Sequence, residues 1–174
     1  MALSLYDHVS DQRIGEWLEQ LGVTDAPLPR GNVRTALQFF SRHMPTLPPN
    51  MALNFLLAMD LSRPVKSLTL SPAEAVIAFR VGTEPPFKLF YTRSSASPHS
   101  SGINSAGRSI VRFRVRMPAP ALESYTTGAI DVWTVPARGQ QLTIAPRARK
   151  QGYMVAGGGM QLIIPRSDDV LEVV

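Results

Sequence analysis

The hydrophobic pattern divides the chain into a helical first part and a second part rich in strands. Up to about residue 60, apolar residues recur every three or four positions, which is the spacing of one helix face. This spacing predicts three helices, over residues 11–21, 33–44 and 51–59. Ser10 or Asp11 is placed to cap the first helix and Gly22 to end it, while Asn32 is placed to cap the second.

From Val76 onward the pattern changes, because β-branched and aromatic residues come in short runs separated by Gly, Pro and Ser. Strands are predicted near residues 76–81, 87–92, 109–117, 130–135, 141–145, 160–164 and 170–174. The third run alternates, with Ile110 and three arginines on one face and Val111, Phe113, Val115 and Met117 on the other. We therefore expect one core face and one wet face there.

The order of these elements predicts an α+β fold, in which a helical segment (1–70) precedes a β-rich domain (71–174). Ser71-Pro72-Ala73-Glu74 has the form of a capping box and predicts one helical turn before the first strand. The helical segment has two readings. It packs on one face of the sheet, or it serves delivery, chaperone contact or target binding.

The amino-acid composition argues against several kinds of functional site. The chain has no cysteine, which excludes disulfides, thiolate zinc sites and a cysteine nucleophile. The three histidines, His8, His43 and His99, are far apart, so we expect no metal site. We also expect no membrane span and no signal peptide, because no long apolar run is present. The chain is then cytoplasmic, or a dedicated machine or larger fusion exports it.

The net charge of +5 is unevenly distributed. Residues 88–116 contain six basic side chains and no acid, and a second basic run lies over residues 138–150. Such a surface attracts nucleic acid, acidic partners or phosphate-bearing small molecules, or it simply keeps strands soluble. A nucleic-acid-binding module would use Phe87, Tyr91 and Trp133 for stacking. The fifteen prolines suit a structural or interaction module without enzymatic activity.

Three segments could carry chemistry, although the usual phosphate-binding loops and the HExxH and GxSxG signatures are missing. They are Phe79-Arg80-Val81-Gly82, the stretch from Phe90 to Ser97, and the stretch from Gly157 to Arg166. The planar guanidinium of Arg80 suits a two-pronged grip on phosphate. Serine hydroxyls orient an arginine or a sugar hydroxyl, and the glycine run presents the amide of Gln161 at the head of a strand.

The order of these segments resembles the ADP-ribosyltransferase-like fold, whose pattern is an arginine, a Ser-Thr-Ser-like motif and a glutamate heading a strand that ends in proline. Arg80 matches the arginine, Ser94 and Ser95 match the serine motif, and Gln161 matches the glutamate in Gln161-Leu162-Ile163-Ile164-Pro165. The glutamine and the glycines before it are more similar to the tuberculosis necrotising toxin-like branch of NAD glycohydrolases. The resemblance covers about residues 76–174.

This resemblance implies a split, mostly antiparallel sheet and NAD as the substrate, with no metal. It implies that Arg80 clamps the pyrophosphate, that Ser94 or Ser95 holds Arg80 or the nicotinamide ribose, that Tyr91 stacks on the ring and that Gln161 bonds a ribose hydroxyl. We expect Arg80 and Gln161 on neighbouring strands. An amide is no base, which favours hydrolysis over transfer unless Glu84, Glu123 or Asp131 enters the site.

The resemblance also implies a biological setting. Such enzymes are bacterial toxins or secreted effectors, which reach the cytoplasm of a target cell without a visible signal peptide. The expected partners are an immunity protein or a secretion chaperone and, for a transferase, a protein or nucleic-acid acceptor. The activity expected is cleavage of the nicotinamide–ribose bond, by an NAD glycohydrolase or an ADP-ribosyltransferase. The binding or structural module remains the alternative.

Overall fold

The computed structural model describes residues 10–81, 87, 89–93, 108–126, 130–131, 145–146, 154–155 and 159–174. The helices in these ranges are α1 (Asp11–Leu21), α2 (Pro27–His43), α3 (Pro49–Leu57) and the short α4 (Ser167–Val170). The strands are β1 (Lys66–Leu70), β2 (Ala75–Val81), β3 (Phe90–Tyr91), β4 (Arg108–Val115), β5 (Ala119–Tyr125), β6 (Ile130–Asp131), β7 (Ala145–Pro146), β8 (Met154–Val155), β9 (Met160–Ile163) and β10 (Leu171–Val173).

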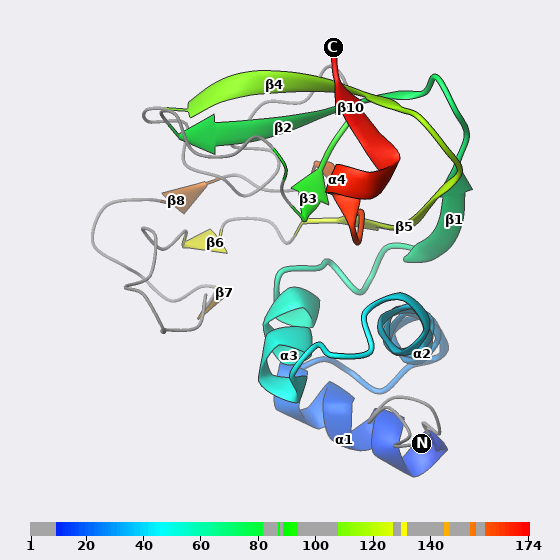
Figure 1. The fold of residues 1–174 in the computed structure, drawn as a ribbon. Coiled ribbons are helices and arrows are strands. Elements are labelled where there is room, and N and C mark those ends of the chain that lie inside the picture. Colours follow the sequence, from blue (N-terminus) through cyan, green and yellow to red (C-terminus); the bar gives the residue numbers. More distant parts are fainter. Residues whose placement is uncertain are drawn as a thin grey trace.

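The strands form antiparallel sheets, which confirms the expected α+β class. We call β1-β5-β9-β3 the helix-covered sheet and β10-β4-β2 the outer sheet. A single bridge between Ile77 and Thr92 joins β2 of the outer sheet to β3 of the other. The third sheet, β7-β6-β8, consists of two-residue strands. In Figure 1, α1, α2 and α3 gather on one side of the strands.

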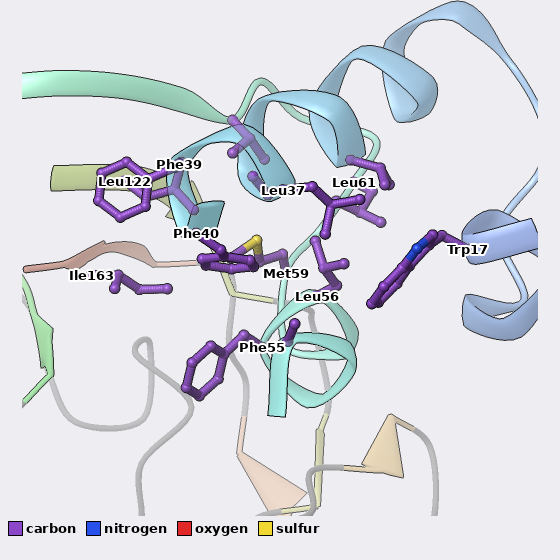
Figure 2. Close-up of a cluster of buried hydrophobic side chains, with 14 of the residues drawn as sticks. Trp17, Leu37, Phe39, Phe40, Phe55, Leu56, Met59, Leu61, Leu122 and Ile163 are labelled. Atoms are coloured by element: carbon purple, nitrogen blue, oxygen red, sulfur yellow. The ribbon is translucent and has the colours of Figure 1, made fainter. Parts of the chain in front are cut away.

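Two apolar clusters hold the layers together. In the first, α1, α2 and α3 pack onto the helix-covered sheet through Leu122 and Ile163, as Figure 2 shows for Phe40, Phe55 and their neighbours. In the second, the other face of that sheet packs against the outer sheet, with Phe113 of β4 edge-on to Tyr91 of β3 at 5.4 Å between ring centroids. The helices thus cover one face of a sheet, which is the arrangement expected if the N-terminal segment has a packing role.

The first helix begins and ends as its sequence predicts. The Ser10 hydroxyl accepts a hydrogen bond from the Arg13 amide at 3.2 Å. Gly22 closes the helix with φ at 67°, and the amide of Val23 reaches the carbonyl of Leu18 at 3.0 Å. This pairing caps the last carbonyls of the helix and needs a left-handed residue at position 22.

Gly22→Ala is expected to lower the free energy of unfolding by about 1 kcal/mol, because a Cβ is disfavoured in the left-handed conformation. Gly15→Ala is the matched control. Gly15 lies inside α1, where an added Cβ would have ordinary contact with the Arg30 Nη1, at 3.8 Å. This change should instead stabilise the protein by about 0.5–1 kcal/mol. Urea titration of both variants measures the difference, and two shifts of the same sign would contradict the capping role.

The second helix starts earlier than its sequence predicts, so the expected cap at Asn32 is wrong. The helix begins at Pro27, with proline in the first turn, and Asn32 lies inside it. Its side chain is 3% exposed and binds the segment between α3 and β1: Nδ2 donates to the carbonyls of Leu61 and Arg63, each at 2.9 Å, and Oδ1 accepts from the Val65 amide at 3.0 Å. From the sequence alone, an asparagine that binds a distant segment cannot be distinguished from an asparagine that caps a helix.

Several strand expectations also change. The pattern missed β1 and β5, although β5 is central to the helix-covered sheet, because Pro120 and the small residues of β5 do not read as a strand. The segment 71–74 forms a turn without a helix, and Ala73 has φ at 75°. Along β4, Val111, Phe113 and Val115 are buried as expected, whereas Met117 is 41% exposed because the strand ends before it. Residues 132–135 and 141–144 lie outside the described ranges.

Candidate active site

Gln161 lies in β9 within a row of polar side chains on the helix-facing side of its sheet. The neighbouring row on that side is apolar and consists of Phe90, Ile163 and Leu122, paired across β3, β9 and β5. The next row on the same face, two residues away along each strand, consists of Thr92, Gln161 and Ser124. We call these three residues the polar row.

The amide of Gln161 is nearly enclosed but poorly satisfied. The residue is 5% exposed, and its Nε2 donates to the Ser124 hydroxyl at 3.3 Å, a long hydrogen bond. Within the described part of the structure, Oε1 has no hydrogen-bond partner. Buried amides usually satisfy most of their hydrogen-bonding capacity, so an oxygen with no partner among the described residues is a place where a donor from a ligand or water fits.

Two described residues beside Gln161, Thr92 and Thr126, have small hydroxyl side chains that bind the backbone. Thr92, 3% exposed, donates from Oγ1 to the Met160 carbonyl at 2.8 Å. Thr126, 2% exposed, binds the Gly159 carbonyl through its amide at 2.9 Å and its hydroxyl at 3.3 Å. These contacts hold Gly159 and Met160, at the start of β9, against the residues that follow β5 and β3.

Arg80 and Gln161 do not lie on neighbouring strands, so that expectation is wrong. Arg80 is in β2, opposite Ser109, whereas Gln161 is in β9, and β3 lies between the two strands. Arg80 comes three residues after the bridge at Ile77. The side chain of Arg80 lies outside the described part.

The remaining residues of the expected site have different surroundings. Tyr91 is 2% exposed, packs against Phe113, and donates from its hydroxyl to the Ser167 Oγ at 2.7 Å. Because its ring is enclosed in the core between the two sheets in this structure, Tyr91 is not part of the proposed NAD site. Ser94 and Ser95 lie outside the described residues, and their assignment stays a prediction.

The acids that could join the site are placed elsewhere or not described. Glu123 precedes Ser124 in β5 and therefore lies on the opposite face from Gln161. There it faces Arg93 at 3.6 Å, and Arg93 also contacts Glu74 at 3.3 Å. The side chains of Glu84 and Asp131 are outside the described part. The polar row itself is therefore uncharged, which suits hydrogen bonding to a neutral group such as a hydroxyl.

Sequence reasoning found Gln161 but missed its neighbours. Ser124 belongs to β5, which the hydrophobic pattern does not predict, and Thr126 directly follows that strand. Thr92 lies in the stretch from Phe90 to Ser97, but its sequence alone assigns it no role. Their alternation with Glu123 and Tyr125 was the available signal, because hydroxyls at every second position mark one face of a strand.

The described residues contain no group of three His, Asp or Glu side chains arranged to hold a metal ion. Over the same ranges, each helix is too short or too polar to cross a bilayer.

Comparison with known proteins gives a structural match only. No family model matches the chain, and no curated protein sequence matches it. The structure of Tse6 in complex with Tsi6 matches with a TM-score of 0.62 at 21% identity, covering 86% of this chain and 98% of that one. Rhs1-CT in complex with cognate immunity protein RhsI1 gives 0.41 at 18% identity, covering 68% and 81%. The chain thus shares the fold of the matched Tse6 chain, and the second score is too low to support an argument.

Proposed function

We propose that this chain is an NAD-consuming enzyme of the bacterial toxin or effector type, which cleaves the bond between nicotinamide and ribose. The observation that carries the proposal is the Gln161 amide, buried in the polar row with an oxygen that has no partner among the described residues. Supporting it are the order of Arg80, the serine segment and Gln161 along the chain, and the fold shared with Tse6.

The chemistry makes specific demands on such a site. The glycosidic bond breaks with its electron pair going to the nicotinamide nitrogen, and the ribose carbon becomes an oxocarbenium-like cation. Water then adds to this carbon and loses a proton, which gives nicotinamide, ADP-ribose and one proton. An enzyme for this step must orient the ribose, hold the diphosphate and limit access of water.

In the proposed site, Gln161 orients the ribose. Its Oε1 accepts a hydrogen bond from a ribose hydroxyl, while Ser124 holds Nε2 and so limits rotation of the amide. Because Gln161 is only 5% exposed, a ligand can contact one edge of its amide and little else of the side chain. Arg80 binds the diphosphate, and Ser94 or Ser95 supports Arg80 or the ribose. An amide cannot accept a proton at neutral pH, which favours hydrolysis over transfer to an acceptor.

A protein of this type is delivered to a target cell and is held inactive in the producing cell. The proposed partners are therefore an immunity protein or a delivery chaperone. In support of a bound partner, the structure of Tse6 that shares this fold is a complex with Tsi6.

The test is incubation of the purified chain with NAD, followed by chromatography of nicotinamide and ADP-ribose. Arg80→Lys is expected to lower turnover about 10- to 100-fold, because an ammonium cannot reproduce a two-pronged contact with phosphate. Arg42→Lys, on the exposed end of α2, is the matched control and should retain full activity. Absence of nicotinamide release from the wild-type chain refutes the enzyme, and equal rates in wild type and Arg80→Lys remove Arg80 from the site.

A further inference from the structure

The solvent-facing side of β4 carries arginines that have no role in the proposed NAD site. Arg112 and Arg114 alternate with the buried Val111, Phe113 and Val115, and Arg116 follows directly after the strand. All three arginines are exposed. Residues two apart on one side of a strand lie about 7 Å from each other, so the guanidinium groups form a spaced row. We call Ile110, Arg112, Arg114 and Arg116, with Glu172 of β10, the arginine face.

Among the described residues, one carboxylate faces the three arginines of this face. Glu172 lies opposite Arg114, and one of its carboxylate oxygens accepts from Nε at 2.8 Å and lies 2.7 Å from Nη2. Within the described part of the structure, Arg112 and Arg116 have no ion pair, which leaves two net positive charges. The side chains of Arg114 and Glu172 are 56% and 43% exposed, so water weakens their pair and a second carboxylate can replace Glu172 at little cost.

An apolar side chain continues the row of arginines. Ile110 is 51% exposed and lies two residues before Arg112 on the same side of β4. Arginine beside exposed aliphatic surface is a composition found in protein interfaces, where arginine is enriched.

We propose that the arginine face is a docking surface for an acidic protein segment that carries carboxylates at alternate positions around an aliphatic contact. An extended segment with this pattern repeats its carboxylates at about 7 Å, the spacing of Arg112 and Arg114. Its aliphatic side chains cover Ile110. The pair between Arg114 and Glu172 already shows how the face binds a carboxylate. A nucleic-acid backbone would satisfy the charges but would leave Ile110 uncovered. This surface is separate from the polar row, so the proposal does not depend on NAD cleavage.

The probe is a fluorescent peptide of alternating glutamate and valine, with binding followed by anisotropy at low salt. Arg112→Gln with Arg114→Gln should weaken binding about tenfold, as expected for two exposed charge pairs. The matched control, Arg42→Gln with Lys66→Gln, removes the same charge from exposed positions elsewhere and should leave binding nearly unchanged. Glu172→Gln should tighten binding, because it removes a competing carboxylate from Arg114. Ile110→Thr should weaken it while keeping a β-branched residue in the strand.

Four results would overturn the proposal. The first is equal weakening by the two double variants, since it would mean that only net charge matters. The second is undiminished binding after Ile110→Thr. The third is tighter binding of a single-stranded oligonucleotide than of the peptide, which would point to nucleic acid. The fourth is failure of the wild-type chain to bind the glutamate peptide better than the same peptide with glutamine. Melting curves confirm that each variant folds.

Discussion

Gln161→Ala is expected to slow nicotinamide release from NAD by about 10²- to 10³-fold. If the amide orients a ribose hydroxyl next to a developing cation, its removal deletes a hydrogen bond that strengthens in the transition state, with a loss of about 2–4 kcal/mol. Folding should be preserved, because the amide makes only one long hydrogen bond, at 3.3 Å to Ser124, among the described residues. Gln38→Ala, on the exposed side of α2, is the matched control and should keep full activity.

Gln161→Glu should behave differently from Gln161→Ala. A carboxylate at this position stabilises the cation by full charge, so NAD cleavage should persist or rise, and transfer to a protein or nucleic-acid acceptor should become detectable. Nicotinamide release and ADP-ribose attachment are measured side by side for the three proteins, after their melting temperatures have been matched. Equal turnover in wild type and Gln161→Ala refutes the role of this residue. No turnover in any of them favours a binding module.

Asn32→Ala should give the largest loss of stability among the changes considered, about 3 kcal/mol in the free energy of unfolding. The substitution leaves the carbonyls of Leu61 and Arg63 and the amide of Val65 without their present partner. Each of these groups lies in or beside the first apolar cluster, where an unsatisfied polar group costs about 1–3 kcal/mol. Urea titration followed by circular dichroism measures the change.

Asn50→Ala is the matched control for this prediction. Asn50 is exposed near the start of α3, and its side chain accepts a single hydrogen bond, from the Met51 amide at 2.9 Å. Because water can replace that contact, the free energy of unfolding should fall by less than about 1 kcal/mol. Similar losses in both variants would mean that Asn32 does not hold the segment that links α3 to β1.

Local sequence signals determined the first helix of this protein. The apolar spacing of α1, its serine cap and its closing glycine are all short-range features, and the structure confirms them. The buried face of β4 was also apparent from the sequence, because apolar residues occupy every second position there. These residues, Val111, Phe113 and Val115, are the ones that the structure buries. In these elements each residue's role depends on neighbours within a few positions.

The tertiary structure decided the roles that depend on distant partners. Asn32 reads as a cap from its neighbours alone, yet its three partners lie about 30 residues further along the chain. Gln161 was found from a motif, but Ser124 became its partner only through the pairing of β5 with β9. Likewise, the single bridge between Ile77 and Thr92 places β3 between Arg80 and Gln161. Strand order and register join residues far apart in sequence, and hydrophobic periodicity carries no information about such pairings.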